Sequence, residues 1–313
     1  KQLIKDYLEK TGDPSLIDFK LHDFGARGVS SLESAGIGGA SHLVNFMGTD
    51  TVSGILFARE HYNAGVAGFS IPAAEHSTIT SWGREHEVDA YRNMLTQFAK
   101  PGSVVAVVSD SYDIYNAVEK LWGEELRQQV IDSGATVVIR PDSGDPVVVN
   151  RKLVEILENK FGYTVNSKGF RVLNNVRLIQ GDGVCERTIQ SILGAFMAHG
   201  WSADNIAFGM GGGLLQQLDR DTQNFALKCS SACINNTWVD VQKDPITDTG
   251  KKSKKGRVAL WESGGEYQSS VAQPKGWTDQ GLEWKPVLQK GFENGNLYNE
   301  ISFSDVRANA NGA

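Results

Sequence analysis

Acidic, arginine, hydroxyl and glycine residues gather directly after four apolar runs of this sequence. The residues at these places are Asp110 and Asp113 in SDSYD, Arg140 and Asp142 in RPDSGDP, Asp182 in GDG, and the glycines of GMGGG at 209–213. Carboxylates hold Mg²⁺ and sugar hydroxyls, arginine binds phosphate, and glycine lets backbone N–H groups approach an anion closely. This combination predicts an enzyme that handles a phosphorylated, metal-bound substrate.

The apolar runs have the pattern of buried β-strands that are followed by helices. With their polar ends they cover 104–113, 136–146, 176–183 and 205–213, and helix-like stretches lie near 34–45, 52–62, 80–98, 114–133, 147–161 and 186–200. Apolar strands that alternate with helices are typical of a parallel sheet. The number of units fits a closed or nearly closed α/β barrel, in which the carboxyl ends of the strands form one rim and substrates bind there.

Length and composition exclude several other classes of protein. The 313 residues are 40% apolar, carry a formal net charge of −6 and include three cysteines. The charge argues against a nucleic-acid-binding surface, and no apolar stretch is long enough to cross a membrane. An odd and sparse set of cysteines fits a reducing cytosol. We therefore expect a cytoplasmic protein with neither nucleic-acid nor membrane partners.

The character of the sequence changes near residue 238. Residues 1–237 read as an α/β barrel that would carry catalysis, whereas 238–313 read as an appendage of hairpins, loops and a short helix near 303–308. The basic run KKSKKGR at 251–257 reads most simply as a solvated loop. Lys1 already lies in a helix-like segment, so we expect that an upstream region is left out and that the appendage is half of a second domain.

Residue types alone leave two readings open for the carboxylates. Arg140 and Asp142 suit a sugar diphosphate and its Mg²⁺, but they could also form a salt-bridged turn. Asp113 could share the metal with Asp142, whereas Asp110 or Ser111 as a helix N-cap is the plain alternative.

A terminal phosphate has two candidate arginines. Arg220 lies about two helical turns beyond GMGGG, and Arg27 lies in DFGARG, but either could instead form a surface ion pair. An isolated His76 beside Glu75 is most simply a hydrogen-bonded structural residue when only residue types are considered.

Longer motifs give the sequence a family resemblance. They are DFGARGVSS (23–31), NFMGTDT (45–51), PAAEHSTITSWG (72–83), VSDSYDIYNAVEKLWG (108–123), IRPDSGDP, IQGDGV, AFGMGGGLLQQLDRD and SKKGR. From near Lys20 to Arg257, and again in SFSDVRANA, the sequence resembles the nicotinamide phosphoribosyltransferases, which are type II phosphoribosyltransferases. The resemblance implies an irregular (β/α) barrel with a partial second domain, in a homodimer.

The activity implied by the resemblance is an entry step of NAD salvage. The phosphoribosyl group of phosphoribosyl pyrophosphate is transferred to nicotinamide, which gives nicotinamide mononucleotide and pyrophosphate. Mg²⁺ is the implied cofactor, and ATP is an optional co-substrate that is hydrolysed through a phosphohistidine.

On the acceptor side, roles can be carried over where the motifs match. The resemblance implies that Phe24 stacks on the pyridine ring, Arg27 contacts the ring substituent or the product phosphate, and Asp50 faces the carboxamide. An ionised Asp50 would accept a hydrogen bond from an amide and repel the carboxylate of nicotinate. His76 matches the histidine that ATP phosphorylates, and Glu75 could orient its ring.

On the donor side, the resemblance implies a larger set. The residues that would hold the ribose and the diphosphate are Arg140 and Asp142, with Asp113 and Ser109 close by. Those that would hold the ribose hydroxyls and the 5′-phosphate are Asp182, Gly183, Gly211, Gly212 and Arg220. Those that would reach phosphates from a neighbouring subunit are Lys228 and Lys243. Mg²⁺ would lie on the diphosphate beside Asp142 and Asp113.

Two alternative functions stay open. Nicotinate phosphoribosyltransferase is a related reading, which Asp50 disfavours. A barrel that binds nucleotide or pyrophosphate without turnover is the alternative from another class. The family's N-terminal region, which completes the second domain and lends an aromatic residue to the nicotinamide pocket across the dimer, does not precede Lys1.

Overall fold

The computed structural model describes residues 1–272 and 283–312 and divides into two compact units. Unit 1 consists of Lys1–Leu218 and Ser302–Ala313, and unit 2 consists of Asp219–Ile301. We describe each unit by itself.

The central sheet of unit 1 is parallel throughout its described part, with the strand order β2-β1-β8-β7-β4-β3. The strands are β1 (Leu21–Asp23), β2 (Gly48–Thr49), β3 (Val104–Val108), β4 (Thr136–Arg140), β7 (Val176–Gln180) and β8 (Ile206–Met210). The four longest strands are the four apolar runs of the sequence, as predicted. Because all strands run the same way, their carboxyl ends lie at one edge.

The segment 69–74 bridges the two edges of this curled sheet. Phe69 pairs in parallel with Gly48 next to β2, and Ala73 pairs in parallel with Ala106 of β3. The Thr49 N–H donates to the Phe69 carbonyl, and the Ala106 N–H donates to the Pro72 carbonyl, each at 2.9 Å. The chain therefore closes the sheet into an irregular barrel, which confirms the predicted fold class.

Side chains alternate between the inside and the outside of the barrel. Ala106, Val138 and Ile179 form one cluster with Ile71 and Phe24, whereas the neighbouring strand residues belong to the larger core. Alternation follows from the two-residue period of a strand. Buried on both faces, the strands need apolar residues at nearly every position, which explains the continuous runs.

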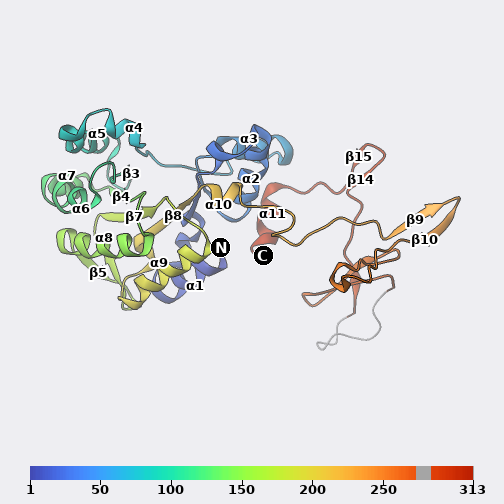
Figure 1. The fold of residues 1–313 in the computed structure, drawn as a ribbon. Helices are drawn as coiled ribbons and strands as arrows, with labels where there is room; N and C mark the ends of the chain where they lie inside the picture. The colour runs from blue at the N-terminus through green and yellow to red at the C-terminus, as the bar shows by residue number, and fades with distance from the viewer. Residues whose placement is uncertain (273–282, 313) are drawn as a thin grey trace. The chain divides into compact units, whose positions relative to one another are not determined.

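Helices surround the strands of unit 1 (Figure 1). They are α1 (Gln2–Thr11), α2 (Leu32–Asn45), α3 (Val52–Tyr62), α4 (His76–Thr80), α5 (Glu87–Phe98), α6 (Ile114–Asn116), a π-helical stretch (Ala117–Glu125), α7 (Arg127–Ser133), α8 (Pro146–Phe161), α9 (Glu186–Ala198) and α10 (Gly212–Leu215). Short 3₁₀ helices cover Pro14–Phe19, Ala26–Gly28, Arg84–His86 and Ala203–Asn205, and a hairpin pairs β5 (Tyr163–Val165) with β6 (Arg171–Leu173).

The helix expected over 80–98 is divided into α4 and α5. Gly83 has φ +84°, a left-handed backbone conformation that interrupts a helix and that glycine adopts without strain. The helix expected over 114–133 is continuous only through the π-helical stretch between α6 and α7.

Unit 2 consists mainly of small antiparallel sheets, as the sequence predicts. The pairs are β9 (Ser231–Ile234) with β10 (Thr237–Asp240), β11 (Ala259–Ser263) with β12 (Glu266–Ser270) and β13 (Lys285–Pro286), and β14 (Phe292–Glu293) with β15 (Asn296–Leu297). A 3₁₀ helix covers Thr249–Lys251. Asn235 and Asn236 turn the first hairpin with φ values of 48° and 62°, the conformation that a tight hairpin turn requires.

The division of the chain differs from the expected boundary after residue 237. Unit 2 already begins at Asp219, and the final helix α11 (Phe303–Ala310), which we expected in the appendage, belongs to unit 1. Phe303 is buried in a cluster with Leu43, and the Arg307 guanidinium donates to the carbonyls of Leu43 and Ala67. These contacts tie the end of the chain to the barrel unit. The expected appendage also includes 273–282, which lie outside the described residues.

A search of the described residues for a helix long and apolar enough to cross a membrane finds none.

Candidate active site

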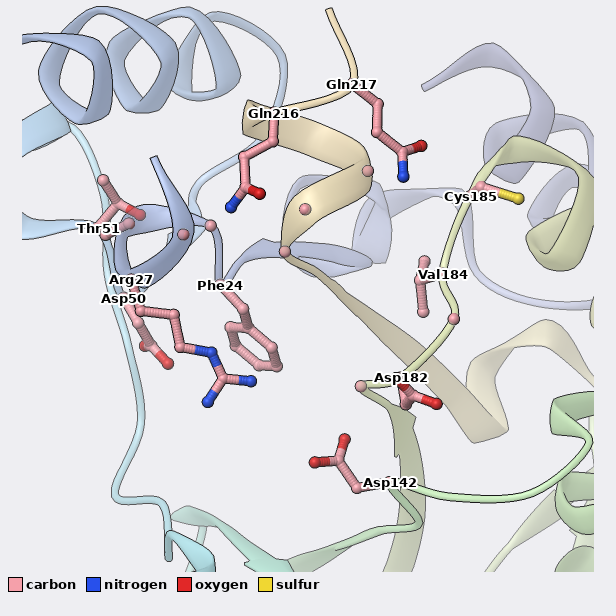
Figure 2. A pocket seen from close by; sticks show the side chains of 18 of the residues that line it. Phe24, Arg27, Asp50, Thr51, Asp142, Asp182, Val184, Cys185, Gln216 and Gln217 are labelled. Carbon is pink, nitrogen blue, oxygen red and sulfur yellow. The ribbon is translucent and has the colours of Figure 1, made fainter. Parts of the chain in front are cut away.

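A pocket of about 710 Å³ opens at the carboxyl ends of the barrel strands. Its lining comes from the loops after β1, β2, β4, β7 and β8, together with Glu75. Figure 2 shows Phe24, Arg27 and Asp50 on one side of this space, Asp142 and Asp182 on another, and Gln216 and Gln217 on the helical turn above. Residues that are far apart in the sequence therefore meet at the rim where the sequence predicted them.

The Phe24 ring rests against the backbone of β8. The Phe24 N–H donates to the Met210 carbonyl at 3.0 Å. A Cβ added at Gly209 would lie 2.7 Å from Cζ of Phe24 and closer still to Cε2. Only glycine leaves room for the ring here. Sequence reasoning placed Gly209 in a glycine-rich turn but did not assign it this supporting role.

A tight turn after β1 presents Arg27 to the pocket. Asp23 is fully buried, and its Oδ1 accepts a hydrogen bond from the Gly25 N–H at 2.8 Å. Burial raises the pKa of the Asp23 carboxyl, with neighbouring Asp50 adding to the effect. The turn leads into the short 3₁₀ helix Ala26–Gly28, which carries Arg27.

Asp50 follows β2 directly and lines the pocket next to Thr51. The Asp50 N–H donates to the Asp23 carbonyl at 2.9 Å, so its backbone continues the pairing of β1 with β2. The Ser70 hydroxyl donates to Asp50 Oδ1 at 2.5 Å. A carboxylate is thus held at the same side of the pocket as an aromatic ring.

The opposite side of the pocket combines a guanidinium with carboxylates. Arg140 Nη2 lies 3.4 Å from Glu75 Oε2 and 3.9 Å from Asp142 Oδ2. Arg140 Nε is buried and has no hydrogen-bond partner among the described residues. Burial raises the pKa of the Asp142 carboxyl; Arg140 opposes the shift, and nearby Asp110 and Asp182 add to it. This side can therefore receive both an anion, through Arg140, and a cation, through the carboxylates.

Glycine-rich turns after β7 and β8 close the site. A Cβ at Gly181 would lie 2.5 Å from Asp142 Oδ1, so the chain passes very close to that carboxylate. Asp182, Gly183, Gly211 and Gly212 all line the pocket, as predicted. The amino ends of α9 and α10 also reach it, and backbone N–H groups there favour anions.

Comparison with known proteins decides the family. Residues 19–295 match the model of the nicotinate phosphoribosyltransferase (NAPRTase) family. A nicotinamide phosphoribosyltransferase of Xanthomonas campestris pv. campestris is 57% identical over 321 residues, which cover 100% of this chain and 67% of that protein. The chain belongs to the nicotinate phosphoribosyltransferase family.

More distant proteins of the family support the same assignment. Two further nicotinamide phosphoribosyltransferases match: that of Acinetobacter baylyi is 32% identical over 330 residues (98% of this chain, 64% of that protein). That of Mycoplasma genitalium is 35% identical over 271 residues (82% of this chain, 57% of that protein). The chain thus spans between 57% and 67% of the length of these relatives. The resemblance predicted from the motifs is confirmed.

His76 lies beside the donor side of the family site, at the start of α4. Its Nε2 is 3.0 Å from Asp110 Oδ1, whereas its Nδ1 is 3.7 Å from Glu75 Oε1 and 3.9 Å from Asp142 Oδ2. Ser143 Oγ donates to the other oxygen of Asp110 at 2.5 Å. Glu75 was expected to orient the ring, but the shorter contact is made by Asp110, which is anchored in turn by Ser143.

Two residues expected near the diphosphate do not line the pocket. Asp113 is the N-cap of α6, and its Oδ1 accepts the N–H groups of Tyr115 and Asn116 at 3.0 and 3.1 Å. N-capping was expected of Asp110 or Ser111 instead. Ser109 is fully buried, and its hydroxyl donates to the Val107 carbonyl and accepts from the Trp122 indole. Their roles toward a ligand stay predictions.

The remaining predicted residues lie in unit 2. Arg220, Lys228 and Lys243 are exposed there, and their contacts with phosphate stay predictions.

Several pocket residues were missed by sequence reasoning. They are Glu75 as a lining residue, Thr51, Val184, Cys185, Gln216 and Gln217. Gln216 and Gln217 lie about one helical turn after the glycines of α10, so helical spacing could have indicated them. Cys185 is the N-cap of α9, and hydrogen bonds from the Thr188 N–H and hydroxyl lower the pKa of its thiol.

No group of three or more histidine, cysteine or acidic side chains in the described residues has the geometry of a metal site. Mg²⁺ differs from transition metals because it keeps several waters and usually binds one or two carboxylates together with substrate phosphates. The raised pKa of Asp142, to which Asp110 and Asp182 contribute, shows that negative charge is concentrated here. These carboxylates fit Mg²⁺ that arrives with a diphosphate.

Proposed function

We propose that this chain carries the substrate site of a nicotinamide phosphoribosyltransferase. The site would transfer the phosphoribosyl group of phosphoribosyl pyrophosphate to nicotinamide, in NAD salvage. The observation that carries the proposal is the division of one pocket into two sides. Phe24 and Asp50 offer a ring face and an amide acceptor, and Arg140, Asp142 and Asp182 offer groups for a sugar diphosphate. Relatives that are 57% and 32% identical are named for this activity.

The chemistry needs charge stabilisation more than a protein nucleophile. The bond from ribose C1 to the pyrophosphate oxygen breaks, its electron pair leaves with pyrophosphate, and the ring nitrogen of nicotinamide forms the new bond to C1. Positive charge develops on the sugar, so Asp142 and Asp182 would favour the transition state electrostatically. The buried guanidinium of Arg140, with its Nε unpartnered in the described structure, would bind the departing diphosphate.

Mg²⁺ would be held by Asp142 and the diphosphate, and it would neutralise negative charge on the leaving group. Asp113 was expected to share it, but the Asp113 carboxylate caps α6. We therefore place Asp182 beside Asp142 as the nearer candidate, because both line the pocket.

The acceptor side favours an uncharged, flat ring. Phe24 would contact one face of the pyridine, and its own orientation is secured by Gly209. Asp50 would accept a hydrogen bond from the carboxamide N–H and disfavour the carboxylate of nicotinate. Two such groups orient the ring nitrogen toward the donor side of the pocket.

ATP would act through His76. A neutral imidazole is a competent phosphoryl acceptor, and a carboxylate that accepts a hydrogen bond from one ring nitrogen leaves the other nitrogen free to attack. Asp110 is in position to hold Nε2, which leaves Nδ1 between Glu75 and Asp142. A phosphate on Nδ1 would then lie next to the diphosphate side of the pocket.

The proposal extends to the assembly. We propose a cytoplasmic homodimer in which Lys228 and Lys243 of one subunit reach phosphates of the other. Sedimentation of the protein, with and without substrates, tests the dimer.

One assay tests the activity. The protein is given phosphoribosyl pyrophosphate and Mg²⁺ with either nicotinamide or nicotinate, and products are separated by chromatography. Nicotinamide mononucleotide as the preferred product supports the proposal, and Asp50→Ser should lower the ratio of kcat/KM for nicotinamide to that for nicotinate. Preferred product from nicotinate would favour a nicotinate phosphoribosyltransferase. Binding of phosphoribosyl pyrophosphate with no product from either acceptor would favour a module without turnover.

A further inference from the structure

The side chain of Asp50 is held by a neighbour that has no part in the proposed reaction. Ser70 Oγ donates to Asp50 Oδ1 at 2.5 Å, which is in the short range of hydrogen bonds from a hydroxyl to a carboxylate. In the described parts of the chain, no other hydrogen bond to the Asp50 carboxylate is formed. Asp50 Oδ2 is therefore available on the side of the pocket that Asp50 lines.

The backbone fixes both residues of this pair. Ser70 follows Phe69, whose carbonyl accepts the Thr49 N–H at 2.9 Å, and Asp50 follows Thr49. The Asp50 N–H is itself bonded to the Asp23 carbonyl. Ser70 and Asp50 are thus carried by paired neighbouring segments of the barrel wall, so their contact is built into the fold.

The titratable groups that face Asp50 do not replace the serine. Burial lowers the pKa of His22, so its imidazole is neutral at neutral pH and supplies no competing cation. Burial also raises the pKa of Asp23, which keeps that carboxyl from adding a full negative charge behind Asp50. Arg27 lies on the same side of the pocket in Figure 2, where its guanidinium faces the open space.

We propose that Ser70 is a positioning residue that sets the choice between amide and acid acceptors. Its hydroxyl would hold the plane of the Asp50 carboxylate and occupy Oδ1, so that Oδ2 accepts the N–H of a carboxamide. Because the Ser70 proton is already donated to Asp50, no hydroxyl is left at this place to donate to the carboxylate of an acid acceptor. This inference rests on the proposed transfer to nicotinamide.

Removing the hydroxyl should therefore weaken the discrimination. In Ser70→Ala, Asp50 is free to rotate and to bind water. We expect the ratio of kcat/KM for nicotinamide to that for nicotinate to fall about tenfold, which is the scale of one hydrogen bond to a charged group. The change should lie mainly in KM for nicotinamide, since Ser70 does not touch the reacting atoms. Ser70→Thr keeps a hydroxyl and should hold the ratio within about threefold of the original.

The experiment uses the full chain with phosphoribosyl pyrophosphate and Mg²⁺, and it adds calorimetric binding of nicotinamide and nicotinate. Ser191→Ala is a matched control, because Ser191 is an exposed serine of α9 whose hydroxyl donates only to the Arg187 carbonyl. It should leave KM and both affinities unchanged. A loss of affinity for nicotinamide but not for nicotinate in Ser70→Ala, with recovery in Ser70→Thr, supports the inference.

Two failures are distinguishable. If the unmodified protein prefers nicotinamide and Ser70→Ala keeps the same ratio, KM and affinities, the role of Ser70 is overturned and the proposed function stands. If the unmodified protein neither binds nor converts nicotinamide, the proposed function is overturned and the role of Ser70 with it.

Discussion

Gly209→Ala tests whether the backbone of β8 holds the aromatic face of the site. A Cβ at this position would lie 2.7 Å from Phe24 Cζ, whereas carbon atoms in contact are about 3.5–4.0 Å apart. The ring must therefore move by about 1 Å or more. It cannot move into β8, so it moves into the pocket, where the pyridine ring of the acceptor would lie. Gly209 has no positive φ, so alanine introduces no backbone strain of its own.

The expected cost falls on the acceptor. Misplacing a positioning group by about 1 Å can lower the rate of a reaction about 100-fold, and we expect that loss in kcat/KM for nicotinamide. The affinity for phosphoribosyl pyrophosphate, measured by calorimetry, should change by less than about threefold. Overpacking costs about 1–3 kcal/mol of unfolding free energy, and the lower end is expected because the ring can turn toward open space.

Two further variants make the test specific. Gly65→Ala is the control, because a Cβ there meets no atom within 4 Å and Gly65 does not line the active-site pocket. In a Phe24→Ala background the clash is absent, so adding Gly209→Ala should cost little more. An unchanged KM for nicotinamide in Gly209→Ala, or an equally large loss in the background without Phe24, would refute the reasoning.

Other perturbations have equally definite outcomes. His76→Ala should abolish ATP hydrolysis and its stimulation of product formation, and leave a slower transfer without ATP; a coupled phosphate-release assay that still shows ATP hydrolysis driving product would contradict the role of His76. Lys20 is buried, and its ammonium donates to three carbonyls at 2.9–3.1 Å, so Lys20→Met should lower the unfolding free energy by about 3 kcal/mol in urea titrations; an unchanged midpoint would contradict this. Because the pKa of the Cys185 thiol is lowered by its hydrogen bonds from Thr188, its alkylation by iodoacetamide should reach half of its maximal rate at lower pH than that of a free cysteine, and phosphoribosyl pyrophosphate should slow it; mass spectrometry of the peptide would refute pocket binding if the substrate gave no protection.

The strands and their polar ends could be predicted because each carries its own local signature. A buried parallel strand is apolar at nearly every position, and its end is marked by the first charged or glycine residue. Asp142, Asp182 and the glycines of α10 therefore lie at the rim as expected. The aromatic and acidic residues of the acceptor side, by contrast, were identified only through the longer motifs that resemble the family.

Pairings across the barrel could not be predicted from local patterns. The closing segment at 69–74 contains Pro72 and pairs through isolated bridges, so it has no recognisable strand pattern, yet it brings Ser70 to Asp50. Similarly, Asp110 and Asp113 both follow one strand. Which of them faces His76 depends on the residue at which α6 begins, and helix ends are uncertain by a residue or two in any local reading.

The closing segment also bears on solubility. A parallel sheet that ended at β2 and β3 would expose two rows of unpaired N–H and carbonyl groups, which are templates for strand addition by another molecule. The bonds made by Phe69, Pro72 and Ala74 occupy part of both rows. Loosening this short stretch would therefore do more than disturb a binding site. It would turn a self-contained ring into a surface with two adhesive margins, and aggregation would be the visible result.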